Sequence, residues 1–438
     1  MSAAGPLIVD DAHKPPYKYK DERVFFLSDL FNKTDDQIQS GLRSNPFVWS
    51  GETSNILVNG YGITVNGTAT GPSCSLSITN VKPDTIYRFR FIGGTALSLV
   101  SLAFEGHSDL SVIEADGQYT EPYLTSYLQI GSGQRYSVLF KTKSLAEVQK
   151  DQSSGRLAYY LQLETRERPT LTRGYALLAY PNQVVVKNTT AVIPTTTVPD
   201  PKPLTLPNTT LGFLDYQLKP LEPNDFPTLS EVTRRVTITV QQIVNGTITW
   251  AENGLPWFDS FPKTPYLVSL YEDLYAPTSD SNHSPSYANA LANGGMDNLT
   301  RTFPAKIGEV LEIVIQNSGV TNGGLDVHPF HAHGMHFWDL GAGNGSYDVT
   351  ANEARLAGTQ PVVRDTTMLY RYGKTTTPGA SAGWRAWRLR VEQPGVWMVH
   401  CHTLQHMIMG KTPFLHWLQK ENLADTHRYA DRLGVWGR

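Results

Sequence analysis

Two short stretches of this sequence concentrate histidine around a single cysteine. HPFHAHGMH begins at His328 and holds four histidines in nine residues, and HCHTLQH begins at His400 and holds three more around Cys401. Imidazole and thiolate groups are ligands that bind copper and zinc. The spacing therefore predicts a metal site. Isolated histidines are usually ordinary polar side chains, and this interpretation applies to the five outside these stretches: His13, His107, His283, His416 and His427.

The second stretch is predicted to continue a β-strand, because VWMVHCH follows a Pro-Gly turn at 394–395. Successive side chains of a strand point to opposite faces. His400 and His402 should therefore share one face, while Cys401 points to the other. His406 follows in Cys-x4-His spacing.

The same parity argument applies to the first stretch. His331 and His333 share a face if the segment is extended, and His328 has the opposite parity. His336 is interpreted as a packing residue or a residue that supports a ligand. The sequence thus predicts two groups of metal ligands. One contains His331, His333, His400 and His402, and the other contains His328, Cys401 and His406.

The second of these groups defines the chemistry most sharply. Two imidazoles and one thiolate form the trigonal ligand set of blue-copper sites, which transfer single electrons. The four remaining imidazoles suit one or more further metal ions. Cys401 is bonded through its own backbone to His400 and His402, which offers electrons a covalent route between the groups.

The elements that must position these ligands are mostly strands. Short apolar runs alternate with clusters of Gly, Pro, Asn and Asp, a pattern typical of all-β proteins built from Greek-key β-sandwich or barrel domains. Helices are predicted only at 284–295 and 422–434. The predicted strands lie at 23–31, 56–67, 85–94, 110–117, 135–142, 234–243, 310–319, 384–395 and 396–402.

A stretch rich in Thr and Pro, 188–210, divides the chain and is predicted to be an extended linker. We therefore expect one β-domain at 1–187, a linker at 188–230, and a C-terminal domain at 231–438 that carries the histidine motifs.

Composition excludes several classes of partner. The formal net charge is only −3, so neither nucleic acid nor a charged membrane surface is expected. No apolar run is long enough to span a bilayer, and the N-terminus does not resemble a signal peptide. The sequons point the other way, because eight Asn-x-Ser/Thr tripeptides indicate a secretory-pathway history and a glycoprotein. The cellular location of the protein therefore stays open. The sequon residues are Asn32, Asn66, Asn188, Asn208, Asn245, Asn282, Asn298 and Asn344.

Only two cysteines are present, Cys74 and Cys401, so a disulfide framework is excluded. We expect Cys401 to be committed to a metal and Cys74 to be a buried free thiol.

The two histidine motifs resemble those of the multicopper oxidases, especially the fungal ascorbate-oxidase-like and laccase-like members. The family motifs His-Pro-x-His-x-His-Gly and His-Cys-His-x3-His stand here as HPFHAHG and HCHTLQH. The resemblance covers nearly the whole chain and implies the second and third cupredoxin domains of that family. It assigns type 1 copper to His328, Cys401 and His406, type 2 copper to His331, and the type 3 pair to His333, His400 and His402.

The sequence departs from the family pattern in two ways. The family's trinuclear centre, which reduces dioxygen, takes four further histidines from a first cupredoxin domain. Before His328 this chain holds only three isolated histidines, so we expect that first domain to be missing. Lys411 stands where the resemblance predicts an axial Met, Leu or Phe. Its ammonium group either points away, or loses its charge and ligates, or lies on a shifted surface loop. Cys74 would be the orphan partner of a first-domain cysteine.

Three functions follow as hypotheses. The first is a copper oxidase that oxidises phenolic or enolic small molecules, in pigment or secondary-metabolite formation, and reduces dioxygen if a partner chain or a longer gene product supplies the missing histidines. The second is an electron-transfer or copper-binding protein that keeps only a type 1 copper. The third is a biosynthetic enzyme that has lost copper chemistry and uses the old cleft as a pocket.

Overall fold

The structure is a computed structural model, and the residues it describes are 4–63, 75–181, 203–258, 266–275, 283–319, 325–373, 377–410 and 414–417. The chain separates into two compact units. The first unit comprises Met1–Ser44, Val48–Pro223 and Thr403–Gln405, and the second comprises Asn45–Phe47, Asn224–His402 and His406–Arg438. The boundaries of 1–187, 188–230 and 231–438 expected from the sequence stay a prediction.

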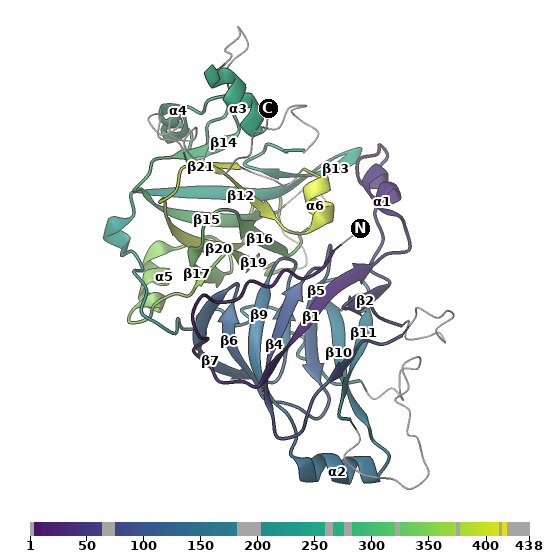
Figure 1. The fold of residues 1–438 in the computed structure, drawn as a ribbon. Helices are drawn as coiled ribbons and strands as arrows, with labels where there is room; N and C mark the ends of the chain where they lie inside the picture. Colours follow the sequence, from purple (N-terminus) through teal and green to yellow (C-terminus); the bar gives the residue numbers. More distant parts are fainter. Residues whose placement is uncertain are drawn as a thin grey trace. The chain divides into compact units, whose positions relative to one another are not determined.

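The first unit contains a six-stranded and a five-stranded sheet, and most of their strands are labelled in Figure 1. The six-stranded sheet has the order β2 (Asn55–Val58), β1 (Asp21–Leu30), β4 (Ile86–Gly93), β9 (Arg135–Lys141), β6 (Leu110–Ala115) and β7 (Gln118–Thr125). The five-stranded sheet has the order β3 (Ile78–Asn80), β11 (Arg173–Ala179), β10 (Ala158–Arg166), β5 (Leu99–Phe104) and β8 (Leu128–Ile130).

The second unit repeats this topology strand for strand. Its six-stranded sheet has the order β13 (Thr247–Glu252), β12 (Arg234–Asn245), β15 (Val310–Ser318), β20 (Ser381–Arg390), β17 (Phe337–Gly343) and β18 (Val363–Arg364). Its five-stranded sheet has the order β14 (Thr302–Ala305), β22 (Phe414–Trp417), β21 (Gly395–Cys401), β16 (His328–Ala332) and β19 (Thr366–Leu369). The predicted all-β architecture of two sandwich domains is therefore confirmed.

Apolar side chains on the inner faces of the sheets form the cores. In β1, Phe25 and Leu27 are buried while their neighbours in the sequence are more exposed, which is the period-2 pattern of a half-buried strand. Phe89 stacks on Phe140 with ring centroids 4.3 Å apart, and Phe25 stacks on Phe91 at 4.8 Å. Every residue of β5 is buried, so this strand lacks the alternation that makes β1 recognisable from the sequence.

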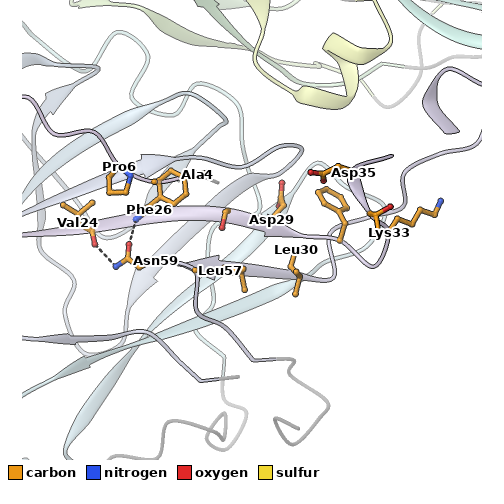
Figure 2. A pocket seen from close by; sticks show the side chains of 15 residues that line it. Ala4, Pro6, Val24, Phe26, Asp29, Leu30, Lys33, Asp35, Leu57 and Asn59 are labelled. Carbon is orange, nitrogen blue, oxygen red and sulfur yellow. Dashed lines mark hydrogen bonds between the residues drawn. The ribbon is translucent and has the colours of Figure 1, made fainter. Parts of the chain in front are cut away.

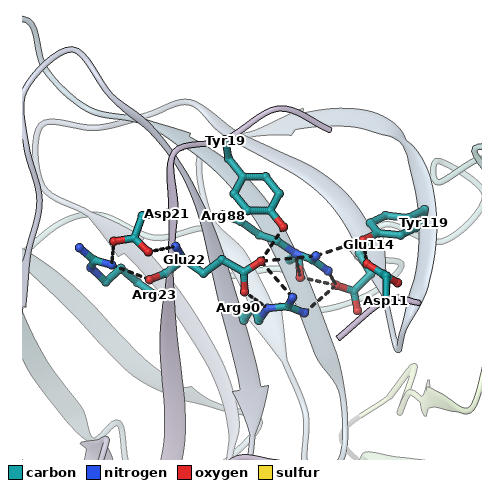
Figure 3. Close-up of polar contacts among 10 residues, drawn as sticks. Asp11, Tyr19, Asp21, Glu22, Arg23, Arg88, Arg90, Glu114 and Tyr119 are labelled. Carbon is teal, nitrogen blue, oxygen red and sulfur yellow. Dashed lines mark hydrogen bonds and ion pairs between the residues drawn. The ribbon is translucent and has the colours of Figure 1, made fainter. Parts of the chain in front are cut away.

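The six-stranded sheet of the first unit also carries a buried charge network (Figure 3). Arg88 of β4 is 2% exposed and lies 2.5 Å from the Glu114 carboxylate of β6. Arg90 pairs with Glu22 of β1, at 2.6 Å. The first pair reaches across β9, and the second joins neighbouring strands. Opposite charges placed this close compensate one another's desolvation.

The helices are short. α1 (Asp35–Leu42) and α2 (Leu145–Ser153) each begin at a capping box, formed by Thr34 with Gln37 and by Ser144 with Glu147. The helix expected within 284–295 is confirmed as α4 (Tyr287–Ala292), and the one expected at 422–434 lies outside the described residues. The sequence interpretation missed the others: α1, α2, α3 (Tyr266–Tyr275), α5 (Val349–Leu356) and α6 (Leu404–Ile408).

Among the described residues, no helix has the length and apolar character needed to cross a membrane. The sequon asparagines that the structure describes are all exposed, which suits glycan attachment: Asn32, Asn208, Asn245, Asn298 and Asn344. The other sequons lie outside the described residues.

Candidate metal centre

Strands β16 and β21 bring the two histidine stretches together. They pair antiparallel, with Phe330 opposite Cys401 and His331 opposite His400. The ladder continues past the strand ends, because the His402 amide donates to the Pro329 carbonyl oxygen. Side chains that alternate along both strands therefore face two different sides of the same strand pair.

The first candidate site combines two imidazoles with one thiol. The His328 Nδ1 lies 3.1 Å from the His406 Nδ1, and the Cys401 Sγ lies 3.7 Å from the former and 3.5 Å from the latter. A point about 2 Å from all three atoms exists, close to the usual bond lengths to a divalent transition metal of about 2.0 Å for nitrogen and about 2.3 Å for sulfur. The three side chains thus fit one metal ion in a trigonal array. We call them the His-Cys-His group.

The His-Cys-His group is almost sealed from solvent. His328 and Cys401 are fully buried, and His406 is 2% exposed. Trp250 of β13 contributes to this seal, since its ring centroid lies 4.7 Å from that of His328 and 4.8 Å from that of His406.

A carboxylate lies at the outer edge of this group. The Asp326 Oδ2 is 3.5 Å from the His406 Nε2, and the Asp326 side chain is 19% exposed. The backbone amide of Val327 donates to the other carboxylate oxygen and fixes its direction. A carboxylate that accepts from the second nitrogen of a ligating histidine orients the ring and makes it a stronger ligand.

The second candidate site lies on the other side of the strand pair. The His333 Nε2 and the His400 Nε2 are 3.2 Å apart, and the ligand atoms of His331, His333 and His400 all lie within 4.8 Å of one another. The His402 ring is 5.4 Å from that of His400 and 5.8 Å from that of His331. The structure thus brings these four imidazoles together. We call them the four-histidine group.

A backbone carbonyl group orients one imidazole of the four-histidine group. The His331 Nδ1 lies 2.8 Å from the Asp365 carbonyl oxygen, which can only accept, so Nδ1 carries the hydrogen. The Nε2 atom is then the free ligand atom. His336 lies beside the same residue, with its Nε2 3.7 Å from an Asp365 carboxylate oxygen. This position fits the supporting role that the sequence left open for it.

Burial keeps another imidazole neutral. Desolvation of the His400 ring, together with the neighbouring histidines, lowers its pKa to about 3, although the nearby Cys401 carbonyl acts in the opposite direction. A neutral imidazole keeps the lone pair that a metal needs. His400 is therefore ready to ligate at neutral pH.

The residue after His333 has to be glycine. Gly334 has a φ of +79°, and a Cβ atom there would collide with the Trp397 indole ring. Both observations explain the glycine that closes the motif HPFHAHG.

His107 and His283, which the sequence analysis interpreted as ordinary polar side chains, lie outside these sites. His107 is buried in the first unit, where its ring nitrogens contact the Glu105 carbonyl oxygen and the Tyr180 hydroxyl group, both at 2.8 Å. His283 lies against Asp273, at 2.9 Å. Cys74, Lys411, His427 and the His416 side chain lie outside the part of the chain that the structure describes, so their predicted roles stay predictions.

Sequence reasoning missed three residues that surround the two sites. Asp326 stands two positions before His328, so an acid beside the motif was a usable signal. Asp365 and Trp250 lie far from both motifs in the sequence, and no local pattern distinguishes them. Trp250 comes from the six-stranded sheet, whereas the histidine stretches include residues of β16 and β21 in the five-stranded sheet of the same unit.

The first unit also contains a groove (Figure 2). It has a volume of about 920 Å³ and lies along β1 and β2, with Val24, Phe26 and Leu57 among its lining residues. Asn59 also lines it, and its side chain donates to the Val24 carbonyl oxygen and accepts from the Phe26 amide. None of the candidate metal ligands lines the groove.

Comparisons with known proteins all identify the same protein family. Two stretches, 21–152 and 271–412, match family models that are both described as multicopper oxidase. The multicopper oxidase aurL2 of Gibberella zeae is 43% identical over 94% of this chain and 69% of its own length. The laccase-like multicopper oxidase 1 of Thermothelomyces thermophilus is 41% identical over the same shares. The crystal structure of Fet3p, a multicopper oxidase that functions in iron import, shares the fold with a TM-score of 0.62 at 21% identity, over 96% of this chain and 72% of that one.

Proposed function

The chain belongs to the multicopper oxidase family of copper-dependent oxidases, and from this premise we propose that it oxidises a phenolic or enolic small molecule by single electrons at the His-Cys-His group. The proposed setting is the formation of a pigment or another secondary metabolite. The proposed ligands are His328, Cys401 and His406.

The donor triangle of the His-Cys-His group is the observation that carries this proposal. Its three ligand atoms are separated by 3.1 to 3.7 Å and surround a point suited to one metal ion. Copper bound there would supply a one-electron Cu(II)/Cu(I) couple. Three buried, mutually adjacent ligands also argue against a metal-free pocket, because burying polar groups without a partner is unfavourable.

We propose that electrons enter at the His406 edge. The Asp326 carboxylate, which faces the His406 Nε2, is the partly exposed group on this side. All three ligands are buried, so water is excluded from the group while the substrate stays outside. Asp326 holds the ring in place during this exchange.

The four-histidine group is proposed to bind further copper. Cys401 connects to it covalently, since His400 and His402 are its chain neighbours. Dioxygen reduction by a trinuclear centre needs ligands beyond these four, so we propose that a partner chain or a longer gene product supplies them. Dioxygen is then the final electron acceptor.

A second candidate function has one observation in its favour. His333 is exposed and His331 and His402 are only partly buried, whereas the His-Cys-His group is sealed. An open imidazole group holds copper less firmly than a sealed site. The alternative is therefore an electron-transfer protein that keeps a single copper in the His-Cys-His group and does not reduce dioxygen.

One set of measurements on the copper-loaded full chain separates these functions. We expect an intense visible band from the Cys401 thiolate, and oxidation of a methoxyphenol or of ascorbate. About four copper ions with oxygen uptake support the oxidase, and about one copper without oxygen uptake supports electron transfer.

The matched control is His13→Gln, which changes an exposed histidine outside both motifs. It should keep the visible band and the copper content. A wild-type chain that binds copper without a visible band would contradict both functions.

A further inference from the structure

Trp250 contacts both imidazoles of the His-Cys-His group from the opposite sheet. Its ring is perpendicular to that of His328, at an interplanar angle of 79° and a centroid distance of 4.7 Å. The same ring is tilted by 48° against His406, at 4.8 Å. One side chain thus spans two ligands that are distant from each other in the sequence.

The backbone fixes the position of this indole. The Trp250 amide donates to the Met409 carbonyl oxygen, at 2.9 Å, just after the helix that carries His406. A Cβ atom on Gly410 would lie only 3.1 Å from the Trp250 carbonyl oxygen, so the glycine permits this close approach. These contacts connect β13 to the segment after α6 and hold the indole against the rings.

We propose that Trp250 is a positioning residue that raises the reduction potential of the copper held by the His-Cys-His group. This inference rests on the proposed function, because it needs copper at that group. Trp250 itself binds neither metal nor substrate in this proposal. It acts through the two imidazoles that it covers.

The physical reason is exclusion of water. Cu(II) carries more charge than Cu(I) and gains more from hydration, so a dry apolar wall disfavours the oxidised state. Trp250 is 2% exposed, and its large ring lies against both imidazole rings. Its packing also limits ring rotation, which keeps a water molecule from joining the trigonal array as a further ligand.

Plain core packing is the competing interpretation, and it makes a different prediction. A residue that only fills the core affects the free energy of unfolding and leaves the potential unchanged. Trp384 provides the matched comparison, because it is 6% exposed in the same unit. It packs in a cluster with Val314, Leu340, Leu356 and Ala386, away from the metal ligands.

The experiment measures the Cu(II)/Cu(I) potential and the visible spectrum of four chains loaded with copper alone. These are the wild type, Trp250→Phe, Trp250→Ser and Trp384→Phe. We expect a shift to more negative potential that is modest for Trp250→Phe and larger for Trp250→Ser, with a weakened visible band in the latter. Trp384→Phe should lose stability and keep the wild-type potential and band.

The outcomes separate this inference from the proposed function. Unchanged potentials in the Trp250 variants, or an equal shift in Trp384→Phe, would overturn the inference while the wild-type band still supports the copper site. A wild-type chain without copper at the His-Cys-His group would overturn both. If Trp250→Ser does not fold, Trp250→Phe still decides, because a phenyl ring preserves an apolar contact.

Discussion

Cys401 and His400 are consecutive residues whose side chains belong to different metal-ligand groups. The Cys401 Sγ lies 3.5 Å from the His406 Nδ1, whereas the His400 Nε2 lies 3.2 Å from the His333 Nε2. Alternation along β21 directs the two side chains to opposite sides. A single peptide bond therefore connects the two groups.

This relationship predicts that the groups can be disabled separately. Cys401→Ser should abolish the visible band and lower the copper content by about one ion per chain, because the thiolate is the ligand responsible for the band. His400→Gln should weaken copper binding only in the four-histidine group and leave the band intact. Elemental analysis and absorption spectra check both. Loss of the band in His400→Gln would show that the groups are not independent.

Asp326→Asn tests whether the carboxylate beside the His406 Nε2 strengthens metal binding. The change removes a negative charge 3.5 Å from the His406 Nε2 and preserves the shape of the side chain. Loss of such an outer carboxylate typically weakens metal binding about 10- to 100-fold. Competition with a chelator measures this affinity. Asp326→Glu serves as control and should recover part of it, and equal affinity of wild type and Asp326→Asn would exclude the role.

Gly334→Ala tests the backbone that positions His333. The added methyl group collides with Trp397 and forces alanine into a φ of +79°, so we expect a loss of about 2–4 kcal/mol in the free energy of unfolding. Gly358→Ala is the control, because its φ is +74° and no atom lies within 4 Å. It should lose about 1 kcal/mol. Urea denaturation measures both, and equal losses would argue against the collision.

Glu312→Gln tests a fully buried ion pair in the second unit. Glu312 and Arg388 are both 0% exposed and their charged atoms lie 2.6 Å apart. Removing one charge leaves the Arg388 guanidinium poorly compensated, although Glu353 also contacts it. We expect a loss of about 3 kcal/mol in the free energy of unfolding.

The control for this pair is Glu231→Gln. Glu231 pairs with Arg390 at the surface, where their side chains are 46% and 29% exposed. Water screens such a pair, so this change should leave stability nearly unaltered. Similar losses for the two variants in thermal unfolding would contradict the importance of burial.

His107 should make the stability of the first unit depend on pH. Burial lowers the pKa of this imidazole to about 4 from the ordinary 6.5, although the Glu105 carbonyl oxygen acts in the opposite direction. Between these two values the unfolded chain binds a proton that the folded chain rejects. This contribution is therefore fully present above pH 6.5 and falls by about 3 kcal/mol as the pH drops to 4.

The measurement compares wild type with His107→Gln by chemical denaturation at several pH values. The variant should be less stable at neutral pH, because it loses the imidazole contacts with Glu105 and Tyr180. It should also lose less stability between pH 6.5 and 4 than the wild type. Parallel curves for the two proteins would show that His107 does not titrate in this window.

Prediction from the sequence succeeded where the pattern is local. β1, β12 and β15 were recognisable because their apolar and turn residues form clear runs. β5 was missed, since all its residues are buried and it includes Ser101. α1 and α2 were missed although their capping boxes are present, because both helices are short and mostly polar. Their stability comes from packing that a single sequence does not display.

The residue types, their spacing and their strand parity were determined by the sequence alone. Covalent geometry reverses the side-chain direction at each strand residue, so the separation of Cys401 from His400 and His402 is a local property. The copper-binding roles of these residues remain a prediction.

Only the tertiary structure decided which distant groups meet. His328 and His406 are 78 positions apart, and their nitrogens come within 3.1 Å because β16 pairs with β21 and α6 follows. Trp250 reaches them from the other sheet, and the Asp326 carboxylate lies 3.5 Å from the His406 Nε2, although the two residues are far apart in the sequence. These contacts depend on how two sheets pack against each other, a long-range arrangement that no local periodicity encodes.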